Sequence, residues 1–166
     1  MRKAIILIVF LCLLGCVSSS KVAQHPVTEL KPELGIDKLE RRNLMLGKWY
    51  GDMPTEEGGR RQWVIHRAND GTYRIDFNIR RADGSEYELT EVGHWGIAGD
   101  VYFSIYRGVI ENEQFLPSDS SDAYNYNAYQ IIKLSHNIFE YQNVDSQNTF
   151  FVTKVPDSFV LGQSKL

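Results

Sequence analysis

The sequence predicts an all-β fold, an eight-stranded antiparallel up-and-down β-barrel that follows a signal peptide and a linker. Segments rich in aromatic and β-branched residues alternate with turn signals at short spacing between residues 44 and 155. Tight turns at residues 69–71 and 82–84 also set apolar residues opposite one another on one face across three strands. Eight strands joined by short hairpins suit a barrel, because closure removes exposed strand edges.

The beginning of the chain has the pattern of an export signal. Arg2 and Lys3 precede a short apolar run over residues 4–14, which is typical of a signal peptide and too short to span a bilayer comfortably. The run ends in Leu13-Leu14-Gly15-Cys16, which resembles a bacterial lipobox. This resemblance implies removal of residues 1–15 and acylation of Cys16, for example with palmitate; the alternative is an ordinary signal peptide with an incidental cysteine.

Cysteine usage and charge restrict the possible partners. Cys12 would leave with the leader and Cys16 would be acylated, so the mature domain would have no disulfide and no cysteine metal site. Loss of Arg2 and Lys3 would take the net charge from −3 to −5. We therefore expect no nucleic-acid partner, and membrane attachment through acyl chains alone. By resemblance to sorted Gram-negative lipoproteins, Val17 in place of Asp favours the outer membrane, facing the periplasm.

The segments that flank the barrel are expected to be simple. Residues 16–43 comprise the acylated N-terminus, a polar Pro-containing linker and a short helix over residues 37–42 with Asp37 as its N-cap. A solvated, charged lead-in is an equally good reading of 37–42. Residues 44–155 form the barrel domain, and residues 156–166 form a C-terminal tail.

Two hairpins have a well-specified register. The turn at 69–71 sets Trp63 against Phe77, and the turn at 82–84 sets Phe77 against Leu89. Residues 72–80 alternate strictly between apolar and polar side chains, so a slip of one residue would expose the apolar face.

The second half of the barrel is predicted from weaker signals. A turn over residues 96–100 would place Trp95 near Val101 and Gly93 near Phe103. Residues 111–123 are expected to be the longest irregular connection in the domain. Strands over residues 124–134, 138–144 and 149–155 then complete the set of eight.

Two motifs resemble the lipocalins and the wider calycins. Gly47-Lys48-Trp49 resembles the Gly-x-Trp of their first strand, and Tyr124-Asn125-Tyr126-Asn127-Ala128-Tyr129 resembles Thr-Asp-Tyr-x-x-Tyr at both tyrosines. The resemblance implies that Trp49 closes one end of the barrel under a basic residue from the last strand, a role that Lys154 is placed to fill. Three strands follow the second motif where a typical lipocalin has two, and no long C-terminal helix pattern follows residue 155, so the resemblance is to the broader calycin shape.

The predicted inner face supplies the candidate ligand-binding residues. Alternation from Trp49 and the paired hairpins places there the apolar side chains of Trp63, Ile75, Phe77, Tyr87, Leu89, Trp95, Phe103 and Ile105, and the charged ones of Arg61, Glu91 and Arg107. In this register Glu91 lies diagonal to Arg107, whereas Arg61 opposes Ile79. A mostly apolar cavity with a few polar groups is typical of a small-molecule site. The alternatives are charges exposed at the barrel mouths and a packed core without a cavity.

No nucleophile motif, phosphate loop or metal-spaced cluster is present, so the sequence predicts a non-enzymatic protein without a cofactor or a metal. The favoured function is a lipid-anchored, lipocalin-like envelope carrier of a small hydrophobic or amphipathic molecule, anionic and fatty-acid-like, with its head group at Arg61. The alternative is an envelope interaction module whose filled barrel presents loops to a protein partner.

Overall fold

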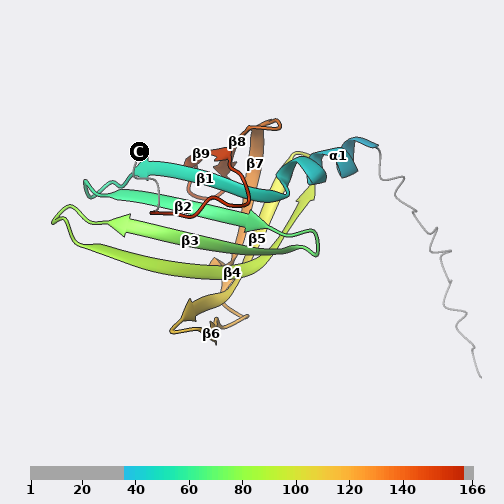
Figure 1. The fold of residues 1–166 in the computed structure, drawn as a ribbon. Helices are drawn as coiled ribbons and strands as arrows, with labels where there is room; N and C mark the ends of the chain where they lie inside the picture. Colours follow the sequence, from blue (N-terminus) through green and yellow to red (C-terminus); the bar gives the residue numbers. More distant parts are fainter. Residues whose placement is uncertain (1–35, 163–166) are drawn as a thin grey trace, which may run out of the picture. The chain divides into compact units, whose positions relative to one another are not determined.

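The computed structural model describes residues 36–162. The predicted signal peptide, the acylation site at Cys16 and the linker up to residue 35 lie outside the described residues, as do residues 163–166. The elements in chain order are α1 (Ile36–Met45), β1 (Gly47–Pro54), β2 (Arg60–Arg67), β3 (Thr72–Arg80), β4 (Glu86–Ala98), β5 (Val101–Glu111), β6 (Gln114–Pro117), a 3-10 turn (Ala123–Asn125), β7 (Tyr126–Leu134), β8 (Ile138–Asn143) and β9 (Thr149–Lys154) (Figure 1).

Eight of these strands close into an antiparallel barrel, as predicted. Within residues 36–162, each barrel strand pairs with the next one in the order β1, β2, β3, β4, β5, β7, β8 and β9. The last of them, β9, pairs back with β1 and closes the barrel. The remaining strand, β6, pairs with the end of β5 and lies beside the ring (Figure 1). The segment 111–123, which was expected to be irregular, therefore contains a short strand.

The first hairpins have the predicted register. Trp63 pairs with Phe77 between β2 and β3, and Phe77 pairs with Leu89 between β3 and β4. Arg61 opposes Ile79, as expected. The strict alternation of β3 specifies this register because one face is buried in the barrel.

The predicted turn between β4 and β5 was wrong. The chain reverses at Gly99-Asp100, so that Ala98 pairs with Val101 and Trp95 pairs with Ser104. Gly99 has φ +59°, which is the left-handed conformation that a two-residue hairpin turn requires. The pairing of β4 with β5 is therefore shifted by an odd number of residues from the predicted one. Because side chains alternate along a strand, the face of β5 that was expected to point inward points outward.

The inversion moves three predicted inner residues to the outside of the barrel. Phe103 is 36% exposed and covers Gly96, where an added Cβ would lie 2.2 Å from the Phe103 ring. Ile105 shares the outer face of β5 with Phe103 by alternation. The Nε of Arg107 lies 3.4 Å from the outward-facing His94 Nδ1.

A β-bulge then restores the original alternation. Gly93 pairs with Tyr106 and Val92 pairs with Gly108, which makes Arg107 the extra residue of the bulge. Glu91 consequently opposes Val109 and not Ile105, so the predicted diagonal pair between Glu91 and Arg107 was wrong.

Helix α1 covers one end of the barrel. It extends to Met45, which is fully buried, so β1 begins three residues later than expected. Arg41 contacts Asp100 in the β4–β5 turn, and Arg42 donates to the Asn69 side chain at 2.7 Å in the β2–β3 turn. These contacts fix the helix against the turns at this end, which Figure 1 shows beside α1.

Trp49 closes the same end from inside, under the predicted cation. Its indole is fully buried, and its Nε1 donates to the Met45 carbonyl at 3.0 Å. The Lys154 Nζ lies 4.6 Å from the Trp49 ring centroid and donates to the Leu46 carbonyl. Gly51 follows on the same face, because a Cβ there would lie 2.1 Å from the Trp63 ring.

Candidate functional site, a cavity inside the barrel

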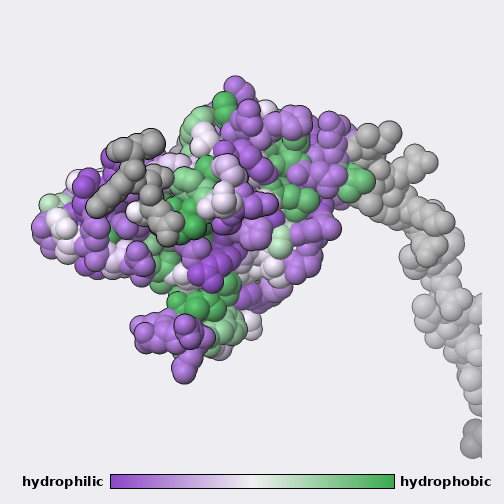
Figure 2. Space-filling model, viewed as in Figure 1, coloured by the Kyte–Doolittle hydropathy of each residue, from purple (hydrophilic) through white to green (hydrophobic). Residues whose placement is uncertain are grey.

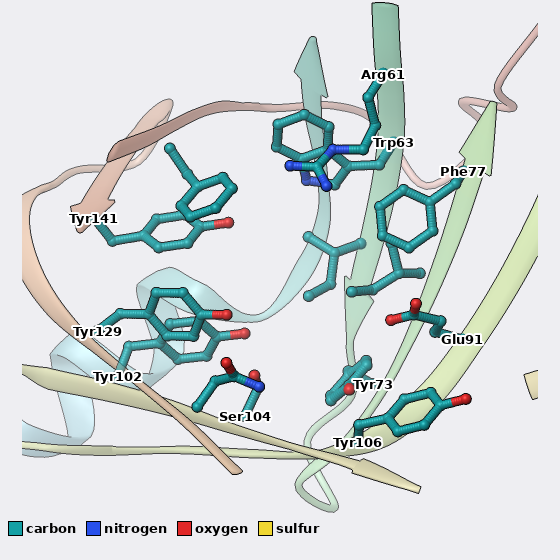
Figure 3. Close-up of a pocket in the computed structure, with 14 residues that line it drawn as sticks. Arg61, Trp63, Tyr73, Phe77, Glu91, Tyr102, Ser104, Tyr106, Tyr129 and Tyr141 are labelled. Carbon is teal, nitrogen blue, oxygen red and sulfur yellow. The ribbon is translucent and has the colours of Figure 1, made fainter. Parts of the chain in front are cut away.

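The barrel encloses a cavity of about 170 Å³, whose wall combines aromatic rings with a few charged and polar groups (Figure 3). Five predicted ligand-binding candidates line it: Arg61, Trp63, Ile75, Phe77 and Glu91. They come from β2, β3 and β4, the strands whose register the sequence predicted. The hypothesis of a packed barrel without a cavity does not fit this interior.

The other predicted candidates lie elsewhere. Tyr87 is 39% exposed near the loops, with the Arg81 guanidinium 4.4 Å from its ring centroid. Leu89 pairs with Phe77 and therefore shares its face of the sheet, but it does not line the cavity. Trp95 is buried towards the α1 end, where its Nε1 donates to the Ala68 carbonyl at 3.1 Å. As described above, Phe103, Ile105 and Arg107 lie on the outer face.

Tyrosines and a serine form part of the wall that was predicted to be mostly apolar. Tyr102, Ser104 and Tyr106 enter from β5 because of the corrected register, and Tyr129 and Tyr141 enter from β7 and β8. The two-residue turn at Gly99-Asp100, one of two turns that the glycines of this stretch suit, sets this register. Burial raises the pKa of the Tyr141 phenol above its usual value, so this hydroxyl stays protonated.

Aromatic stacking organises one wall. The rings of Phe139 and Tyr141 stack with centroids 4.4 Å apart, and those of Tyr141 and Phe150 stack with centroids 5.3 Å apart. Arginines lie at the two ends of this column, Arg67 5.3 Å from the Phe139 centroid and Arg61 6.0 Å from the Phe150 centroid. The stacked rings therefore lie between the guanidinium groups of two arginines, each within cation–π distance of the column.

Arg61 marks the boundary between the cavity and the loops. Its guanidinium lies 5.6 Å from the Trp63 centroid, and one nitrogen donates to Met53 Sδ at 3.4 Å. Its buried Nε has no hydrogen-bond partner among the described residues. Arg61 also lines a depression of about 390 Å³ near the β1–β2 and β3–β4 loops, with Ile79 and Tyr87. A ligand at Arg61 can therefore extend inward or towards the loops.

Glu91 is the acidic residue of the cavity wall, and it is half-buried. Burial raises the pKa of its carboxyl, whereas the charge of Arg61 lowers it. None of the ion pairs within 4.0 Å that join described residues links the two groups. The cavity thus contains two opposite charges that are coupled but not in direct contact.

Sequence reasoning missed Arg67, although it follows Trp63 and Ile65 on the inner face of β2. It is 1% exposed, and its guanidinium lies 4.7 Å from the Tyr102 centroid. All three guanidinium nitrogens lack a hydrogen-bond partner among residues 36–162. The aromatic faces compensate part of the cost of burying this cation.

The described residues contain neither a candidate metal cluster nor a helix suited to span a membrane. No cluster of three or more His, Cys, Asp or Glu residues between positions 36 and 162 has a geometry suited to a metal ion. In the same part of the chain, no helix has the length and apolar character needed to cross a membrane.

Four features together define a lipocalin-like fold: the closed up-and-down barrel, the helix before β1, the Trp49–Lys154 contact and the internal cavity.

The two tyrosines of the second motif lie on different sides of the barrel wall. Tyr129 lines the cavity, whereas Tyr126 is 47% exposed and donates to the Ser120 carbonyl at 2.9 Å.

The chain is similar to a solved structure of low sequence identity. It is a lipocalin-like protein from Bacteroides uniformis, 13% identical to this chain, with a TM-score of 0.42; the match covers 68% of this chain and 99% of the other. No protein-family model and no curated protein matches the sequence.

Proposed function

We propose that the protein binds a small amphipathic molecule with an acidic group inside its barrel and acts as a lipid-anchored carrier in a bacterial cell envelope. The observation that supports this most is Arg61, whose guanidinium faces the cavity with a buried Nε that no described residue engages. A cation out of water demands a partner, and a guanidinium is suited to bidentate contact with a carboxylate or a phosphate.

The cavity limits the size of the ligand. The volume of about 170 Å³ suits a small ligand group. A compact group therefore fits between Trp63, Phe77 and the tyrosines, whereas a longer fatty-acid-like chain would extend past Arg61 into the depression near the loops. The rings of the wall supply the apolar contact, and Arg61 supplies the specificity for an acid.

Displacement of a fluorescent fatty acid from delipidated protein tests this function. We expect Arg61→Ala to weaken binding of the acid at least tenfold and to leave a neutral analogue of equal length unchanged. Arg74→Ala is the matched control, because Arg74 is exposed on β3 and lines neither the cavity nor the depression near the loops. Absence of binding at micromolar concentration by correctly folded protein would refute a carrier of fatty-acid-like molecules.

The membrane anchor is a separate part of the proposal and is supported by the lipobox-like sequence before Cys16. Metabolic labelling with palmitate should mark the wild-type protein, and Cys16→Ser should abolish the label and leave an uncleaved precursor. Normal cleavage of an unlabelled wild-type protein would refute the anchor without affecting the carrier function.

An interaction module is the second candidate. Phe115 and Leu116 on β6 are 51% and 43% exposed, and Figure 2 shows apolar surface beside this strand. Among the described strands, β6 pairs with β5 alone, so its other edge is free to accept a strand. Failure of every small-molecule probe would favour this candidate.

A further inference from the structure

Glu91 presents a carboxylate to the cavity that a purely anionic ligand would leave without a partner. Figure 3 shows the Glu91 carboxylate and the Arg61 guanidinium both pointing into the space between the strands. None of the hydrogen bonds or ion pairs between described residues engages the Glu91 carboxylate, and its neighbour across β5 is the apolar Val109. The carboxylate is half-buried in the cavity wall and has no donor among the described residues, so a donor group of a ligand would improve its environment.

The surroundings of Glu91 suit an ammonium group. Tyr73, Phe77 and Tyr106 line the same cavity, and Figure 3 shows their rings around the Glu91 side chain. The charge of Glu91 contributes to raising the pKa of Tyr73 and of Tyr106, which places the three groups within electrostatic reach. Aromatic faces beside a carboxylate are a general means of holding an organic cation.

We propose that the ligand is a small amino-acid-like zwitterion, whose carboxylate contacts Arg61 and whose ammonium contacts Glu91 and the neighbouring aromatic rings. This inference rests on the proposed function and specifies its ligand class. A simple acid would pair with Arg61 but would be repelled by an ionised Glu91. A simple amine would pair with Glu91 but would be repelled by Arg61. A zwitterion satisfies both charges within a cavity of about 170 Å³.

A series of ω-amino acids with chains of graded length, from β-alanine to 6-aminohexanoate, tests the inference by isothermal titration calorimetry. Each is compared with the acid and the amine of matched length, for example 5-aminopentanoate with pentanoate and pentylamine. Because hydrogen bonds to charged groups are the stronger ones, at least one zwitterion should bind more than about tenfold tighter than either of its matched compounds.

Variants assign the two ends of the ligand. Glu91→Gln should remove the preference for the zwitterion over the matched acid, while Arg61→Gln should remove its preference over the matched amine. Glu88→Gln is the control, because Glu88 is exposed on the same strand as Glu91. Near-ultraviolet circular dichroism of each variant verifies the aromatic packing.

The failure of this inference differs from failure of the proposed function. If acids bind through Arg61 as tightly as every zwitterion of equal length, or if Glu91→Gln leaves the preference intact, the zwitterion is refuted and the carrier of an acid remains. If neither the fluorescent fatty acid nor any member of the series binds, both proposals are refuted.

Discussion

Replacement of Trp49 by Ala tests whether this indole organises the closed end of the barrel. The side chain is fully buried, contacts the Phe139 ring edge-on at 6.0 Å and donates to the Met45 carbonyl. Removing a buried indole costs about 3–5 kcal/mol through lost burial and the cavity that remains. Because domains of this size are stable by about 5–15 kcal/mol, the loss would be a large fraction of the total.

Urea unfolding followed by far-ultraviolet circular dichroism measures the effect. We expect a lower midpoint with an unchanged slope, because the surface exposed on unfolding stays similar. Trp49→Phe should lower the free energy of unfolding by less than Trp49→Ala, because phenylalanine keeps most of the apolar volume. It removes mainly the hydrogen bond to the Met45 carbonyl. Phe151→Ala on β9, where the ring is 52% exposed, serves as the control with a change of about 0.5 kcal/mol or less. Equal midpoints for wild type and Trp49→Ala would refute the reasoning.

Three further predictions concern the barrel. Lys154→Met should cost about 0.5–2 kcal/mol in urea unfolding, less than Trp49→Ala, because it removes a cation–π contact but keeps the aliphatic stem. Gly51→Ala should destabilise by about 1–3 kcal/mol, because its Cβ would lie 2.1 Å from the Trp63 ring; a neutral effect would contradict this packing. Hydrogen bonds from Arg60 hold the pKa of Asp52 at about 2, so its stabilising contribution is present above its ordinary pKa and is lost as pH falls towards 2. Asp52→Asn should make the free energy of unfolding depend less on pH between the ordinary pKa of Asp and pH 2. An unchanged pH dependence in that range would show that the Asp52–Arg60 pair contributes nothing to stability.

The sequence allowed the register of β2, β3 and β4 to be predicted because local signals agreed. Strict alternation along β3 and turns that each contain a glycine with positive φ, Gly71 and Gly84, leave one pairing that keeps the apolar face continuous. Arg61, Trp63 and Glu91 could therefore be placed on the inner face correctly.

The register of β5 could not be predicted because the signals conflicted. Gly96 and Gly99 both suit a turn, and the choice depends on a tertiary contact, the packing of Phe103 over Gly96. The bulge at Arg107 depends on a second tertiary contact, the close approach of Gly93 to β5. A Cβ at Gly93 would lie 2.1 Å from the Ile105 carbonyl oxygen. Both contacts join different strands, so neither has a local signature in the sequence.

The corrected register also changes the chemistry of the cavity. With Phe103 and Ile105 inside, the wall would be apolar, and Arg107 would neutralise Glu91. The structure instead places Tyr102, Ser104 and Tyr106 inside, and the bulge carries Arg107 away to His94. The interior thereby gains hydroxyl groups and keeps a carboxylate without a protein cation in direct contact. Such a wall suits charged and hydrogen-bonding groups better than a plain hydrocarbon chain, as the proposed zwitterionic ligand requires.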